Sequence, residues 1–200
     1  LEQRGDVLEI MGDYETAINI YLAALDIAEV SEVRARLHRK IGAILLKKDE
    51  PDKALVHLEL GKKELEKEKT PEYGRILSTV GLLYELRGDY EKAFDAHKHA
   101  LDIFSSFEGA EKDTADVLNR IGACHWYKGD YSLAMVYFEK SLKLYENLRN
   151  LRGSAGALNN LGVVSYVRGE CDKALEFYER SLKQCEKIGN FEGIATALGN

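Results

Sequence analysis

Three asparagines have the chemistry best suited to holding another molecule: Asn119, Asn159 and Asn160. A side-chain amide offers both a hydrogen-bond donor and an acceptor, so each of them can pair with the backbone of an extended peptide. Such residues are also ordinary on the open face of a helix, where polar side chains simply meet water. The sequence therefore leaves two interpretations open, a peptide-binding role and plain solvation.

Basic and aromatic side chains form the second set of candidate binding residues. Arginine and the large aromatic residues are enriched where binding energy concentrates at interfaces. The aromatic members could equally pack between neighbouring helices, because they bury large apolar areas. The set comprises Arg39, Lys40, Arg75, Arg120, Trp126, Tyr127 and Tyr166.

The chain shows no arrangement that predicts catalysis, a cofactor or a metal site. We find no Ser/His/Asp grouping, phosphate-binding loop or paired-carboxylate motif. His97 and His99 are two residues apart, so on a helix they point to different faces and make a poor metal pair. The three cysteines lack metal-ligand spacing, and we expect them to be reduced thiols of a cytoplasmic protein: Cys124, Cys171 and Cys185. We therefore predict that the chain is not an enzyme.

Composition and charge argue against two classes of partner. The 200 residues are 45% hydrophobic and 31% charged, which suits an ordered chain. The formal net charge is −6, unlike the basic, aromatic-interleaved composition of a nucleic-acid-binding protein. No apolar run approaches the roughly 20 residues needed to cross a bilayer. We expect no nucleic acid and no membrane, and a protein or peptide as the partner.

A block of about 40 residues recurs along the chain and must position these side chains. Its mark is a turn followed by an alanine, as in RGDYEKA at 87–93. The closing alanines are Ala17, Ala54, Ala93, Ala134 and Ala174. Glycines keep the same period: Gly5, Gly42, Gly81, Gly122, Gly162 and Gly199. Two small-residue series that stay in phase at this period predict a helical repeat array.

The third repeat shows how one block should fold. We predict a first helix from Glu72 to Arg87, ended by Gly88. Asp89 can cap the second helix by accepting backbone N–H bonds. The repeat glycine and alanine are expected to be small because the paired helices approach closely there, and a larger residue would force them apart.

These motifs resemble the tetratricopeptide repeat, whose helix-turn-helix carries a small residue in each helix and a Gly-Asp-Tyr-like turn. The resemblance covers essentially the whole chain. It implies an all-α solenoid, a right-handed superhelix of antiparallel helix pairs whose first helices line the concave surface. The usual period is about 34 residues, so these longer repeats are similar to those of kinesin light chains, spindle-orientation adaptors and the repeat arrays of signalling NTPases.

The second repeat departs most from this pattern. Asp49 replaces the turn glycine, Pro51 the aromatic residue and Gly61 the late alanine, so we expect its helix pair to pack less regularly. We expect a single array, with repeats at approximately 1–32, 33–71, 72–112, 113–152 and 153–190 and a partial repeat at 191–200. Because Leu1 is not an initiator methionine and Asn200 falls within an expected helix, we expect part of a longer protein whose end faces fray or self-associate.

Helical geometry selects the residues that face the predicted groove. They lie six, three and two residues before each repeat glycine and one and five after it. Over the second to fifth repeats this face holds six basic residues and one acidic residue. We therefore expect an acidic or carboxylate-bearing peptide, because the charges would steer its association. The chaperone-type carboxylate clamp is not expected, because Asp6 rather than asparagine follows the first repeat glycine.

The expected function is a protein–protein interaction scaffold that binds a partner peptide or helix in the concave groove. The alternative is a ligand-sensing regulatory array within a larger signalling ATPase or transcription regulator. A phosphate-binding loop in the full-length sequence would favour the alternative.

Overall fold

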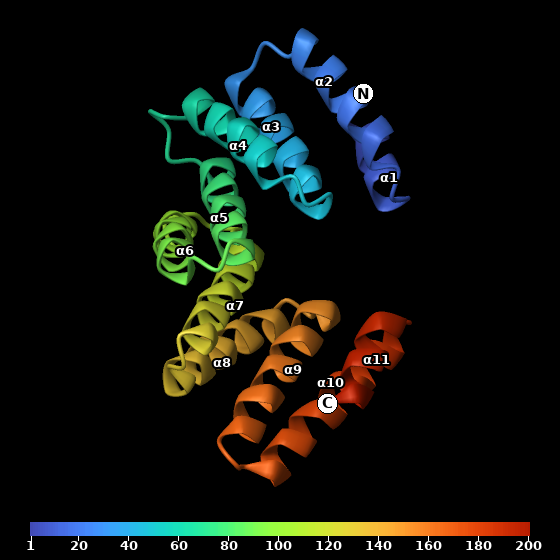
Figure 1. Ribbon diagram of the computed structural model, residues 1–200, viewed down its shortest axis with the longest axis vertical. Coiled ribbons are helices and arrows are strands. Elements are labelled where there is room, and N and C mark those ends of the chain that lie inside the picture. The colour runs from blue at the N-terminus through green and yellow to red at the C-terminus, as the bar shows by residue number, and fades with distance from the viewer. The chain divides into compact units, whose positions relative to one another are not determined.

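The computed structural model describes residues 1–200 as eleven α-helices joined by short turns, with no β-strand (Figure 1). The all-helical prediction is confirmed. No helix combines the length and the apolar character that crossing a bilayer requires. The helices are α1 (Glu2–Ile10), α2 (Tyr14–Ile27), α3 (Ser31–Lys47), α4 (Pro51–Glu64), α5 (Pro71–Leu86), α6 (Tyr90–Phe104), α7 (Glu111–Tyr127), α8 (Tyr131–Asn147), α9 (Leu151–Val167), α10 (Cys171–Lys187) and α11 (Phe191–Gly199).

Turns between the helices rely on residues in the left-handed backbone region. Gly88 has a φ of 74° after α5, and Asp89 caps α6 by accepting the Lys92 backbone N–H at 3.3 Å, as predicted. Asp49 takes a φ of 59° after α3 and so makes the turn that glycine makes elsewhere. Pro51 begins α4, where its missing N–H removes no helical hydrogen bond.

The departures in the second repeat therefore do not disturb its packing, contrary to the expectation. Ala54, Leu58 and Gly61 are all buried on α4, which packs along α3. A Cβ at Gly61 would lie 3.1 Å from the Ala35 carbonyl oxygen, so glycine lets the two helices approach at this point. Glycine here performs the spacing role that alanine or serine performs late in the other second helices.

At the first five repeat glycines, a large side chain from the second helix fills the space that the glycine leaves open. A Cβ at Gly122 would lie 2.7 Å from the Phe138 ring, and one at Gly42 would lie 2.9 Å from the Leu58 side chain. These positions require a small residue, as predicted, because the side chain of the paired helix packs directly on the glycine. This side chain always lies 16 positions after the glycine: Tyr21, Leu58, His97, Phe138 and Tyr178.

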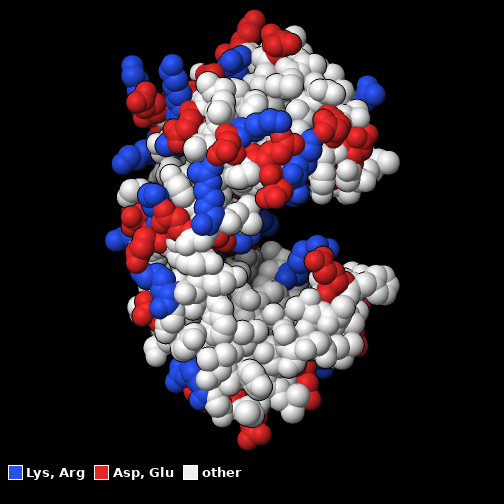
Figure 2. All heavy atoms as spheres, in the orientation of Figure 1, with Lys and Arg blue, Asp and Glu red and all other residues white.

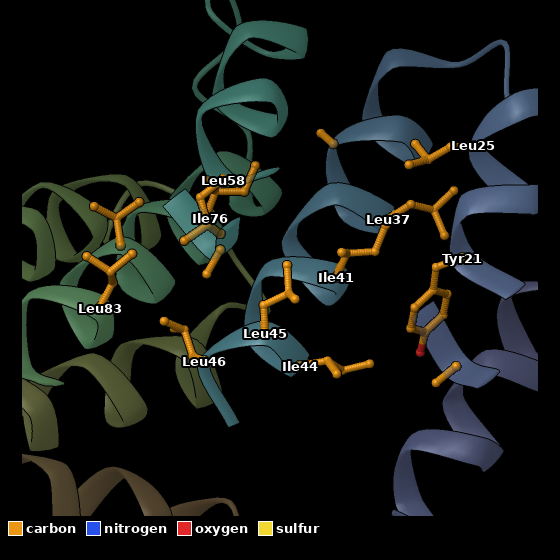
Figure 3. Packing of buried hydrophobic residues seen from close by; sticks show 14 of the residues in the cluster. Tyr21, Leu25, Leu37, Ile41, Ile44, Leu45, Leu46, Leu58, Ile76 and Leu83 are labelled. Atoms are coloured by element: carbon orange, nitrogen blue, oxygen red, sulfur yellow. The ribbon is translucent and has the colours of Figure 1, made fainter. Parts of the chain in front are cut away.

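The helices form two compact units, residues 1–103 (unit 1) and 104–200 (unit 2). In unit 1, α3 packs against both α2 and α4, and α5 packs against α3 and α4. Figure 3 shows the apolar core that these helices share, with Ile41 from α3 lying between Tyr21 of α2 on the right and Ile76 of α5 on the left. Tyr21 is fully buried, and its hydroxyl donates to Asp6 of α1 at 2.5 Å.

In unit 2, α8 packs between α7 and α9, and α10 packs between α9 and α11. Phe138, Leu158 and Leu161 lie in its buried core. Two buried serines tie each second helix to the first helix of its own pair. Ser141 donates to the Ala115 carbonyl at 2.8 Å, and Ser181 donates to the Ala155 carbonyl at 2.9 Å.

Candidate functional site

The predicted basic residues of unit 1 all lie in ion pairs, and those of Arg39 and Lys40 join neighbouring first helices. Arg39 of α3 binds Glu72 of α5, with 2.6 Å between Nε and Oε1. Arg75, one turn along α5, approaches the other oxygen of the same carboxylate at 3.2 Å. Glu72 is only 1% exposed, so two arginines converge on one buried carboxylate.

Lys40 is paired in the same way with α1. Its Nζ lies 2.8 Å from Glu2 and 2.5 Å from Asp6. Arg36 also binds Glu2 at 2.8 Å, and this hydrogen bond to the guanidinium lowers the pKa of the Glu2 carboxyl to about 2. The positive charge counted on the predicted face of α3 is thus largely neutralised by α1.

The sequence already contained the signal for this pairing. Glu2 lies three residues before Gly5 and Asp6 one residue after it, so both occupy groove-facing positions of the first repeat. The charge count covered only the second to fifth repeats and therefore missed them. Figure 2 shows both signs of charge interleaved on the visible face of unit 1, whereas the visible face of unit 2 carries few charged atoms.

The three predicted asparagines of unit 2 lie together across adjacent first helices. The Asn160 amide of α9 donates to the Asn119 carbonyl oxygen of α7 at 3.1 Å. The neighbouring Asn159 accepts from Asn200, at the end of α11, at 2.9 Å. Asn119, Asn159 and Asn160 are half-buried, and each retains amide hydrogen-bonding capacity beyond these bonds. Asn200 was not among the predicted site residues, although it lies 41 residues, or about one repeat, after Asn159.

A pocket of about 310 Å³ opens beside these amides, between α9, the end of α10 and α11. Asn159 and Asn160 line it together with Gly156, one turn earlier on the same predicted face of α9. The remaining lining residues were not among the predicted site residues, and half of them come from α11 and the loop before it. These residues are Arg152, Ala155, Ser181, Cys185, Asn190, Glu192, Gly193 and Thr196.

The charged groups on the α7 part of this face differ in their environment. Asp116 accepts a 2.6 Å hydrogen bond from the Tyr145 hydroxyl and lies 2.8 Å from Lys112. Burial raises the pKa of Tyr145 well above its ordinary value, and the hydrogen bond to Asp116 adds to the effect. Arg120 lies on the same face and is exposed. This exposure makes Arg120 accessible to a ligand on the same face as Asn119.

The three predicted aromatic residues divide between packing and exposure. The Trp126 ring is tilted against Tyr131, with 5.1 Å between centroids, and packs against the core of unit 2. Tyr127 and Tyr166 are 58% and 63% exposed. Tyr166 lines a second, more apolar pocket of about 410 Å³ with Leu175 and Leu198. The packing interpretation thus fits Trp126, while the other two side chains are accessible.

Comparison with solved structures finds the same fold in functionally diverse proteins. BtubC (BKLC) from P. vanneervenii is 19% identical, with a TM-score of 0.78 over 94% of this chain and 79% of that protein. The plasmid pLS20 Rap conjugation regulator in complex with the Phr* peptide is 23% identical, with a TM-score of 0.82 over 96% of this chain. A signal transduction ATPase (STAND) from Pyrococcus horikoshii with a tetratricopeptide repeat sensor is 16% identical, with a TM-score of 0.85 over 98%.

This chain spans 54% of the Rap regulator and 30% of the ATPase. At these identities the likeness shows the fold alone. The comparison with curated proteins finds no match to this sequence.

The family comparison agrees with the repeat pattern and with the helix pairs. Three family models, each described as tetratricopeptide repeat, match residues 1–30, 72–147 and 154–188. Together they account for most of the sequence, and the helix pair around Gly42 lies outside the matched segments. The chain belongs to the tetratricopeptide repeat family.

Proposed function

We propose that this chain binds an extended peptide across the first-helix face of unit 2, formed by α7, α9 and α11. The observation that carries this proposal is the pair of amide contacts, Asn160 to Asn119 and Asn159 to Asn200, beside an open pocket. A tetratricopeptide array is a protein-interaction repeat domain, and the Rap regulator of the same fold was solved with a peptide bound.

The amide pairs suit a peptide because of what they can exchange. A peptide backbone alternates N–H donors and C=O acceptors, and a side-chain amide can satisfy one of each. A bound strand can therefore replace an Asn–Asn hydrogen bond with Asn–backbone hydrogen bonds without leaving a polar group unpaired. Exposed Arg120, together with Arg152 at the pocket, would favour an acidic residue in that peptide.

The proposal places ligand contacts in unit 2 and assigns the unit 1 basic residues a different role. Arg39 and Lys40 already bind carboxylates of neighbouring helices, and Arg75 binds Glu72 of its own helix, so contact with a ligand would require breaking those pairs. We propose that they fix the spacing of first helices in unit 1. Tyr127 and Tyr166 remain proposed peripheral contacts.

A peptide selected from a random dodecapeptide library on the wild-type chain provides the test. Asn159→Ala should weaken its binding by about 1–3 kcal/mol, because a buried peptide group loses its partner. Arg120→Ala should mainly slow association with an acidic peptide, and added salt should shrink that difference. Lys143→Ala, at an exposed position of α8, is the matched control. Wild-type affinity in both site variants, or failure to select any peptide, would refute the proposal.

The sensor function remains the second candidate, and the likeness to the STAND ATPase favours it. In that case the same groove would detect a ligand on behalf of an ATPase module elsewhere in a longer chain. Measuring the ATPase rate of the full-length protein with and without the selected peptide separates the two functions. An unchanged rate, or a full-length sequence without a phosphate-binding loop, excludes the sensor.

A further inference from the structure

Gly156 is a glycine that neither packing nor backbone geometry explains. It lies in the interior of α9 with an ordinary helical backbone, outside the set of residues with positive φ. A Cβ at this position would meet no atom within 4 Å. Gly122 is the opposite case, because a Cβ there would collide with the Phe138 ring.

Glycine in a helix interior is unfavourable compared with alanine, because it gives up more backbone freedom on folding. A glycine that no fold contact requires is expected where another backbone or a ligand approaches closely. Gly156 is exposed and forms part of the wall of the pocket between α9 and α11. Gly156 therefore lies where a ligand bound on the first-helix face of unit 2 would touch α9.

The residues around Gly156 are polar and open to hydrogen bonding. Asn159 and Asn160 follow one turn later, and Arg152 precedes it by one turn. Glu192 faces the same pocket from the first turn of α11. Arg152 and Glu192 are exposed and form no ion pair, so the pocket offers one cation and one carboxylate that the fold does not use.

We propose that Gly156 is the point where the main chain of the bound peptide lies closest to α9. The pocket beside it receives one polar side chain of that peptide, held between Arg152, Glu192 and the asparagine amides. This inference rests on the proposed peptide-binding function. It adds the location of closest approach and the polar character of the bound side chain.

The test uses the opposite effects that Gly156→Ala should have on stability and on binding. The methyl group meets no neighbour and alanine favours the helix, so the melting temperature should rise by about 2–4 °C. The same methyl group occupies the space of the peptide backbone, so the affinity for the library-selected dodecapeptide should fall at least about tenfold. Gly156→Val should weaken binding further, and Lys143→Ala should change neither quantity.

The side-chain part of the inference has its own measurement. An alanine scan of the selected peptide should find one polar residue whose loss weakens binding to the wild type by about tenfold. The same peptide substitution should matter much less in the Arg152→Gln and Glu192→Gln variants, because its partners are already altered. An aliphatic residue at that position, or equal losses in all three proteins, would contradict a polar pocket.

Comparing Gly156→Ala with Asn159→Ala separates failure of this inference from failure of the proposed function. If Asn159→Ala weakens binding but Gly156→Ala does not, peptide binding stands and the close approach at Gly156 is wrong. If neither variant weakens binding, or if no peptide is selected, the proposed function itself fails. A lower melting temperature for Gly156→Ala would show that the fold requires this glycine, which also overturns the inference.

Discussion

Removing the Glu72 carboxylate should destabilise unit 1 more than removing a surface charge would. Glu72 is 1% exposed, and its carboxylate lies 2.6 Å from the Arg39 guanidinium. The substitution Glu72→Ala removes this carboxylate from both Arg39 and Arg75. Breaking one partner of a fully buried ion pair costs about 3–5 kcal/mol. The two arginine side chains retain 20% and 40% exposure, so water can partly replace the carboxylate. We therefore expect a loss of about 2–3 kcal/mol.

Urea unfolding followed by circular dichroism measures this loss, with the slope against urea expected to stay unchanged. A double-mutant cycle with Arg39→Ala should give a coupling energy of at least about 1 kcal/mol. Glu59→Ala removes the exposed partner of Lys62 on α4 and should cost less than about 0.5 kcal/mol. A loss for Glu72→Ala as small as this control would refute the reasoning that a buried carboxylate holds α3 to α5.

Further predictions concern the helix interfaces, a turn and the response to acid. Gly122→Ala should lower the free energy of unfolding by about 1–3 kcal/mol, because its Cβ would lie 2.7 Å from the Phe138 ring. Alanine has the better helix propensity, so chemical denaturation shows which effect is larger. Gly129→Ala should cost about 1 kcal/mol or more, because alanine at a φ of 81° is strained; its melting curve should shift downwards. The folded pKa of Glu2 is lowered to about 2 by Arg36, so its ion pair stabilises the fold fully above pH 4.5 and is lost as the pH falls towards 2. The stability difference between wild type and Glu2→Gln, about 1–2 kcal/mol at neutral pH after allowance for solvent screening, should vanish over that range in urea titrations.

The sequence by itself determined the helical architecture, because its signals are local. The phase of the glycine and alanine series specified the helix pairs, and Gly88 with Asp89 marked a turn to within a residue or two. The series also identified positions where the packing requires a small residue. It did not show that a side chain 16 residues later fills the space at each of the first five glycines, since that depends on how two helices cross.

The pairing of polar side chains on the first-helix faces was decided only by the tertiary structure. The face-selecting arithmetic correctly brought Asn119, Asn159 and Asn160 to neighbouring helices, because equivalent positions of successive repeats share one face. The same arithmetic counted Arg39 as positive charge available to a ligand. Its charge is instead satisfied by Glu72, 33 residues away in sequence and on the next first helix. Helix formation and turns depend mainly on residues a few positions apart, so the sequence pattern predicts them. Side-chain pairing across helices depends on three-dimensional distance and burial, which a one-dimensional periodicity does not contain.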